Sequence, residues 1–234
     1  MSETARNLYE MGNEVKPRTY QNKVIEGKDD FITKELICEQ YCLTHLEDPA
    51  PLFVFTKSKD WAEAEFQERI HPGQINPGEA WKLRPEIWEE FLVDGKYFDY
   101  TYSERLHIFH KGPEIHQLDN VITTLRDDPH SRRAMVMIFE PEDTRATAGA
   151  LTRVPCSVSY QFLIRNNRLH VIYYIRSNDF FKHFAIDIWL TEAMMDYVFN
   201  ILAATYPSLK KGSLHYFAGS LHAYNEDLSK WVIY

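Results

Sequence analysis

A change of hydrophobic pattern in the second half of the chain limits the folds that are open to it. Residues 132–139, 156–165 and 168–177 are rich in β-branched and aromatic side chains, which predicts strands. Asn166-Asn167 separates the last two runs and indicates a hairpin turn. Residues 180–206 then form a long apolar stretch with little amphipathicity, which predicts a helix buried on most sides. We therefore expect an α+β fold in which helices pack on a mixed sheet around one long buried helix.

The remaining elements follow from periodicity and turn residues. We expect a last strand over residues 213–224 and a short helix after it. Irregular stretches are short, and 234 residues suit one domain, 1–234, better than two. In the first half we predict a strand or strand pair over residues 32–43, and helices over residues 60–70 (with Asp60 as N-cap), 84–93 (with Pro85 near its start) and 117–128.

Charge and cysteine content exclude several classes of protein. The net charge of −8 is the reverse of what non-specific binding to nucleic acid needs, so we expect no direct nucleic-acid partner. No apolar run reaches eighteen residues and the first residues lack a secretory signal, so we expect no membrane partner and a cytoplasmic location, or the host cytoplasm for a viral protein. Three cysteines fit reduced thiols. Cys38 and Cys42 are read as buried strand or core residues, and we expect no metal.

Cys156 is the first candidate for chemistry. A lone cysteine is usually a small core residue. Pro155 before it and small polar residues after it weaken that interpretation. A nearby cation would lower the pKa of the thiol and make it a nucleophile, and Arg176, twenty residues later, can supply that cation from an adjacent strand. The residues alone leave both interpretations open.

Four blocks between Asp128 and Tyr224 give Cys156 a context: DDPHSRRAMVMIF, RVPCSVSYQFLI, RSND and AGSLHAY, in this order. They resemble the thymidylate synthase superfamily, whereas the first 110 residues match it only loosely. The resemblance implies a thymidylate synthase-like fold. It also implies that Cys156 adds to C6 of a pyrimidine nucleotide, after which C5 attacks the methylene group of 5,10-methylenetetrahydrofolate, the cosubstrate.

The same resemblance assigns substrate-binding roles. It implies a homodimer in which Arg132 and Arg133 reach the partner's site; alternatively they are an ordinary charged strand start. Gln161 would orient the cysteine and the nucleotide, or it is a polar residue on an exposed strand face. The other implied contacts are to the phosphate, from Arg176, Ser177 and, more weakly, Lys28, and to the sugar hydroxyl, from His222 and Tyr224.

Four residues would serve the cosubstrate and the proton transfers. Asp179 would contact the pterin, and Trp88 would flank the folate pocket. Glu65, favoured over Glu63 and Glu68, would organise water and move protons, although most acids on such a helix are merely solvated. Tyr100 would assist removal of the C5 proton.

Asp187 departs from the synthase pattern, which has Asn at this spacing. The phage deoxycytidylate hydroxymethylases carry Asp here together with R-S-N-D, and this is the nearest resemblance. A protonated carboxyl can donate to N3 of cytosine and accept from its amino group, so we read Asp187 as the residue that selects cytosine. Alternatively, Asp187 is a helix residue that pairs with Lys182 or His183. Ser157 and Ser220 also replace the usual synthase residues.

The expected activity is therefore 5-hydroxymethylation of a cytidine nucleotide, dCMP with CMP as a further option. Water attack on the transferred carbon gives the hydroxymethyl group, whereas hydride transfer gives a methyl group. Two alternatives stay open: reductive methylation, of dCMP or of dUMP as in a thymidylate synthase, and a catalytically silent nucleotide-binding relative.

Overall fold

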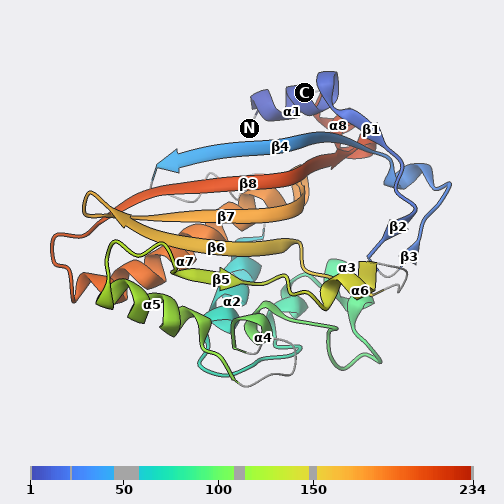
Figure 1. Ribbon diagram of the computed structural model, residues 1–234. Coiled ribbons are helices and arrows are strands. Elements are labelled where there is room, and N and C mark those ends of the chain that lie inside the picture. Colours follow the sequence, from blue (N-terminus) through green and yellow to red (C-terminus); the bar gives the residue numbers. More distant parts are fainter. Residues whose placement is uncertain (1, 22, 45–57, 108–113, 148–151, 233–234) are drawn as a thin grey trace.

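The computed structural model describes residues 2–21, 23–44, 58–107, 114–147 and 152–232. Its centre is a six-stranded sheet with the order β1-β4-β8-β7-β6-β5 (Figure 1). β7 and β8 run parallel, and the other neighbours are antiparallel, so the sheet is mixed as predicted. The strands are β1 (Asn13–Val15), β4 (Thr33–Thr44), β5 (Met135–Met137), β6 (Ser157–Arg165), β7 (Arg168–Asp179) and β8 (Lys210–Tyr224), with a separate hairpin of β2 (Thr19–Tyr20) and β3 (Lys23–Val24).

Helices α2, α5 and α7 lie on one face of the sheet, whereas α1 and α8 lie beside β4 and β8 (Figure 1). This arrangement confirms the α+β prediction. The α-helices are α1 (Ser2–Met11), α2 (Lys59–Ile70), α3 (Pro85–Trp88), α4 (Tyr102–His107), α5 (Gln117–Asp127), α6 (Asp143–Thr147), α7 (Ala185–Ala203) and α8 (Asn225–Val232). Shorter turns are the 3-10 helices η1 (Asp29–Phe31), η3 (Ala80–Leu83) and η4 (Glu89–Phe91), and the π-helix η5 (Phe180–Phe184).

The hairpin and the long helix form as predicted. Asn166 and Asn167 both have positive φ, 51° and 56°, as a two-residue turn between β6 and β7 requires. The apolar stretch begins with one π-helical turn and continues as α7, which packs against α2, α5, β7 and β8. Ten of its nineteen residues are buried, which explains its weak amphipathicity.

Three local predictions are wrong in detail. The N-cap of α2 is Ser58, and Asp60 lies within the first turn, where its negative charge still favours the helix dipole. The predicted helix over residues 84–93 is a short α3 followed by η4, because tertiary packing of Trp88 and Phe91 overrides helix periodicity. The strand predicted over residues 132–139 shortens to β5.

The second face of the sheet lacks a covering helix among the described residues. We call this second face the open face. Cross-strand register places two rows of side chains on it. Met135 and Met137 are 42% and 37% exposed, a large value for methionine in a sheet. The rows are Met135, Gln161, Ile172, His215 and Cys42, and Met137, Ser159, Tyr174, Phe217 and Gln40.

The prediction that Cys38 and Cys42 are buried is wrong, because both are exposed. Cys42 lies on the open face, opposite His215. Cys38 has φ of 64°, and neither it nor Gly219 on the facing strand is paired, so the ladder between β4 and β8 is interrupted there without a change of register. Strand periodicity predicts which residues share a face, but it does not tell which face another layer will cover.

Candidate active site

Cys156 lies just before β6, and Arg176 on β7 holds the segment around it. The backbone N–H of Arg176 donates to the Cys156 carbonyl oxygen at 2.8 Å. The Arg176 Nε donates to the Pro155 carbonyl oxygen at 2.9 Å, and Nη2 donates to that of Val154 at 3.3 Å. The same Nη2 lies 4.0 Å from the Cys156 Sγ. The structure therefore brings the thiol and the guanidinium together across antiparallel strands, as the spacing predicted.

Opposing effects act on the charge of this thiol. Burial raises the pKa of Cys156, and the negative charge of Asp187 raises it further. The guanidinium groups of Arg176 and Arg153 oppose this by favouring the thiolate. Because the net direction is upward, the resting thiol keeps its proton until a ligand or base changes the surroundings.

Asp187 sits in the first turn of α7 and points toward the end of β7. Its Oδ2 accepts a hydrogen bond from the Asn178 Nδ2 at 3.0 Å, and the same Nδ2 donates to the Tyr216 hydroxyl oxygen at 2.6 Å. Burial raises the pKa of Asp187 to about 7, while Arg69 and the Asn178 bond oppose the rise. The carboxyl therefore exists in both protonation states near neutral pH.

The alternative partners for Asp187 are engaged elsewhere. Lys182 Nζ lies 3.3 Å from an Asp227 oxygen and 3.8 Å from an Asp179 oxygen. The His183 ring packs edge-on against Trp88, with 6.4 Å between ring centroids. Burial lowers the pKa of His183 to about 3, so this imidazole is neutral at physiological pH.

Asp179, His222 and Tyr224 gather at the ends of β7 and β8. Asp179 and His222 are register partners, and the His222 and Tyr224 ring centroids are 6.0 Å apart. Alternation along β8 puts these two rings on one side, as predicted. Burial lowers the pKa of His222 to about 4, which leaves a neutral ring that can bond a sugar hydroxyl. Asp179 Oδ1 accepts from the backbone N–H groups of Phe181 and Lys182, and burial raises the pKa of Asp179 to about 6.

A pocket that we call the tryptophan pocket brings together three of the predicted residues: Glu65, Trp88 and Tyr100. Glu65 Oε1 accepts from the buried Arg69 Nε at 2.9 Å, so this acid is anchored by an ion pair. Burial raises the pKa of Tyr100 to about 12, and its hydroxyl stays protonated. The other lining residues are Trp61, Glu68, Pro77, Trp81, Phe98, Thr101, Tyr102, Ser103 and Arg153.

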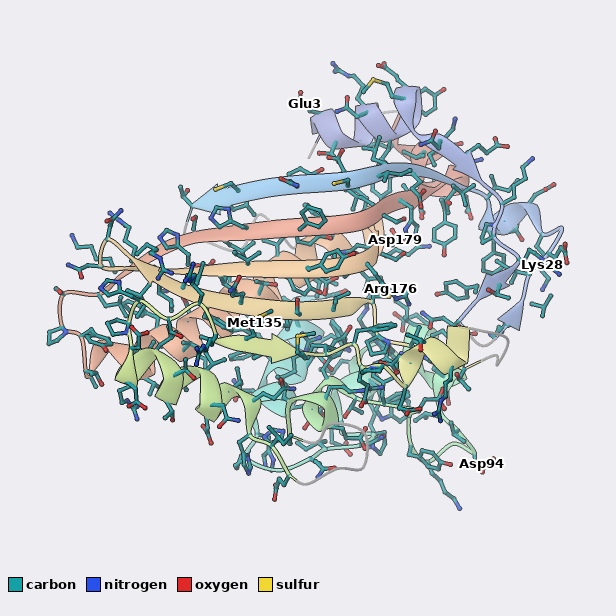
Figure 2. All side chains as sticks on the ribbon, viewed as in Figure 1. Glu3, Lys28, Asp94, Met135, Arg176 and Asp179 are labelled. Carbon is teal, nitrogen blue, oxygen red and sulfur yellow. The ribbon has the colours of Figure 1, made fainter. Side chains whose placement is uncertain are left out.

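Four predicted residues lie apart from this group within one chain. Gln161 is on the open face, and its amide donates to the Arg132 carbonyl oxygen at 2.9 Å, an arrangement that matches the strand-face interpretation. Arg132 and Arg133 are exposed just before β5. Lys28 is the exposed N-cap of η1; Figure 2 shows it beyond the β2–β3 hairpin, across from Arg176 and Asp179.

Sequence reasoning missed Arg153 and Asn178 as site residues. Both lie inside blocks that were already singled out, three residues before Cys156 and between Ser177 and Asp179. It also missed Ser157, whose Oγ bonds the hydroxyl groups of Tyr102 (3.1 Å) and Tyr173 (2.5 Å) beneath the thiol. Among the residues that the structure describes, no His, Cys, Asp and Glu side chains gather in threes as a metal site, and no helix is long and apolar enough to cross a membrane.

Comparisons with known proteins agree with this geometry. The family model described as thymidylate synthase matches residues 74–232. A protein of Methanosarcina barkeri named "Putative thymidylate synthase" is 30% identical over 153 residues, which cover 63% of this chain and 65% of the relative. A protein of the same name from Methanocaldococcus jannaschii is 27% identical over 186 residues, 72% of this chain and 82% of the relative. The deoxyuridylate hydroxymethyltransferase of Bacillus phage SP01 is 27% identical over 146 residues, 59% of this chain and 37% of the relative.

Proposed function

Because the chain belongs to the thymidylate synthase family, we propose that it moves the one-carbon unit of 5,10-methylenetetrahydrofolate to C5 of a cytidine nucleotide and adds water, giving the 5-hydroxymethyl product. The substrate is dCMP, with CMP as a further option. One observation carries the choice of cytidine: the partly buried carboxyl of Asp187 accepts a hydrogen bond from Asn178, and desolvation raises its pKa to about 7.

The chain's own residues account for binding and activation. Arg176 and Ser177 hold the phosphate, and His222 and Tyr224 bond the sugar. The cosubstrate supplies an electrophilic methylene carbon. The Cys156 sulfur gives up its proton and forms a bond to C6 of the ring, which makes C5 nucleophilic toward that carbon. Tyr100 then helps water to take the C5 proton, the bond between the transferred carbon and tetrahydrofolate breaks, and that carbon remains on C5 as an exocyclic methylene group while Cys156 is still bonded to C6.

Hydroxymethyl transfer ends with water adding to the transferred carbon, after which the Cys156 sulfur leaves C6 and the ring is restored. We assign the activation of this water to Glu65, which lines the tryptophan pocket and whose Oε1 is fixed by the ion pair to Arg69, so that Oε2 can bond water. Asp179 and Trp88 bound the same region from β7 and α3 and receive the folate ring system.

The proton on Asp187 underlies base selection. When the Asp187 carboxyl carries a proton, it can form two hydrogen bonds to a cytosine ring. Its O–H donates to N3, and its other oxygen accepts from the amino group. The Oδ2 atom, held by Asn178, retains a lone pair for that second bond. An ionised carboxylate would instead face O4 of uracil, and two acceptors in contact within a buried site are repulsive.

A uridine nucleotide is the second candidate substrate. The phage relative is named for hydroxymethyl transfer to deoxyuridylate, and a protonated Asp187 can also donate to O4 and accept from N3–H. The relatives named as thymidylate synthases favour a third outcome, reductive methylation.

We also propose that the protein works as a homodimer built on the open face. Met135, Met137, Ile172, Tyr174 and Phe217 form an apolar surface there, and such surfaces mark protein interfaces. Arg132 and Arg133 are exposed at the start of β5, at the border of this face. They therefore reach into the partner's site instead of their own.

A tritium assay tests these proposals. The protein is incubated with 5,10-methylenetetrahydrofolate and with dCMP, CMP or dUMP labelled at C5, and the products are weighed by mass spectrometry. We expect tritium release from the cytidine nucleotide and a gain of one CH₂O unit. Release from dUMP alone refutes the cytidine assignment, a methyl product with dihydrofolate refutes hydroxymethylation, and binding without release indicates the silent relative.

A further inference from the structure

The tryptophan pocket presents hydrogen-bond donors without acceptors to match them. Three of its buried nitrogen atoms have no hydrogen-bond partner among the described residues: Trp81 Nε1, Trp88 Nε1 and Arg153 Nε. The Oε1 atoms of the wall carboxylates are already engaged, since Glu65 Oε1 accepts from Arg69 and Glu68 Oε1 accepts from the backbone N–H groups of Glu79 and Ala80. Buried donors normally have partners, so this set indicates a ligand that is rich in acceptor atoms.

Arg153 is the strongest of these donors. Its side chain belongs to a residue only 7% exposed, and it has no ion pair with a carboxylate in the ranges that the structure describes. Aromatic rings surround its guanidinium carbon, with centroids 4.6 Å away for Phe91, 5.2 Å for Tyr100, 5.4 Å for Trp88 and 5.6 Å for Phe98. Ring faces attract the cation, but a buried charge without an anion remains costly.

The anion must therefore arrive with a ligand of the neighbouring reaction centre, because Arg153 lies three residues before Cys156. Resting on the proposed function, we propose that Arg153 is a specificity-determining residue for the cosubstrate. With the indole N–H groups of Trp81 and Trp88, it binds the carbonyl and carboxylate oxygens of the p-aminobenzoyl-glutamate part of the reduced folate.

The p-aminobenzoyl-glutamate part matches these donors better than the pterin or the nucleotide phosphate does. The glutamate carries the only negative charges of a reduced folate, and the benzoyl ring suits an aromatic wall in which Trp61 and Trp88 stack on each other with centroids 5.6 Å apart. The pterin has N–H donors that would need acceptors. The nucleotide phosphate is a second source of anions, but it is strongly hydrated, and a cage of aromatic rings around Arg153 suits it poorly.

The test compares two ligands that differ in the glutamate and its negative charges. Binding of tetrahydrofolate and of the primary amide of tetrahydropteroate, which keeps the benzoyl carbonyl but carries no carboxylate, is followed through quenching of tryptophan fluorescence, with the nucleotide present and no one-carbon unit, so that no turnover occurs. We expect the native protein to bind tetrahydrofolate about tenfold or more tightly than this amide, the range of a charge-assisted hydrogen bond. Arg153→Met, which keeps the apolar stem among the rings, abolishes that preference, and Arg153→Lys restores part of it.

Controls separate the possible failures. Arg145→Met removes an arginine whose side chain is 81% exposed on α6 and should keep the full preference. An equal preference in Arg153→Met and the native protein, or none in the native protein, overturns the proposal. Weaker nucleotide binding in Arg153→Met with the folate preference intact also overturns it and assigns Arg153 to the phosphate. If Arg153→Met removes the preference for tetrahydrofolate, the proposal about Arg153 is supported, whether or not the protein releases tritium from a nucleotide. Absence of tritium release from every nucleotide would refute only the proposed function.

Discussion

The partly buried carboxyl of Asp187 predicts an unusual dependence of stability on pH. Its pKa is raised by burial from 3.8 to about 7 in the folded protein. Below about pH 4 the group is protonated in both the folded and the unfolded state and has no effect. Between pH 4 and pH 7 the unfolded chain loses this proton first, so the free energy of unfolding falls as the pH rises. Above pH 7 this carboxyl is ionised in both states, and the free energy of unfolding no longer changes through it.

The structure sets the size of this effect. Each pKa unit corresponds to about 1.4 kcal/mol, so the ionised carboxylate costs up to about 4 kcal/mol above pH 7. Asp187→Asn removes the charge but keeps the shape, and the new amide oxygen can still accept from Asn178. The variant should match the native protein at pH 4 and become more stable than it by a few kcal/mol at pH 8.

Urea denaturation between pH 4 and pH 9 measures this difference directly. Asp94→Asn is the matched control, because Asp94 is exposed on a loop (Figure 2) and should give a curve parallel to that of the native protein. If the Asp187→Asn and native curves are also parallel, the carboxyl is not held in a buried site and the argument for base selection loses its physical basis.

Three further variants test the chemistry and the assembly. Cys156→Ser should lose tritium release while it still binds the nucleotide in equilibrium dialysis; substantial turnover in this variant contradicts a sulfur–C6 bond. Asp187→Asn should shift the ratio of tritium release toward dUMP, since an amide can donate to O4 and accept from N3–H, and an unchanged ratio speaks against Asp187 as the base reader. Met137→Glu should convert the dimer to a monomer in sedimentation velocity, whereas the exposed Lys96→Glu should not; a native-like dimer in the methionine variant excludes the open face as the interface.

Sequence patterns predicted the elements whose structure is local. The Asn166-Asn167 turn, the strands on either side of it and the apolar helix α7 depend on backbone preference and periodicity, and all three form as expected. The proximity of Cys156 and Arg176 was predictable for the same reason, because a hairpin fixes which residues of its two strands are neighbours.

Tertiary relations were not predictable in this way. Whether Cys42 is buried depends on whether a layer covers the open face, which no property of β4 reports. The role of Asn178 depends on Asp187, which comes from another element, and the cage around Arg153 draws its rings from α3, η4 and the segment before α4. Local pattern shows that such residues exist, but only the assembled fold shows what they touch.

The hydrogen bonds of Arg176 have a consequence for any experiment that replaces it. A guanidinium carries five N–H groups. Here Nε donates to the Pro155 carbonyl and Nη2 to the Val154 carbonyl, so within the described part of the chain the Nη1 hydrogens remain for the phosphate contact proposed above. Removing this side chain would therefore release the peptide segment that carries Cys156 and, in the proposed function, would also remove a contact to the nucleotide. A drop in turnover after such a replacement would mix misplacement of the nucleophile with loss of substrate, and only a separate measurement of thiol reactivity would tell the two apart.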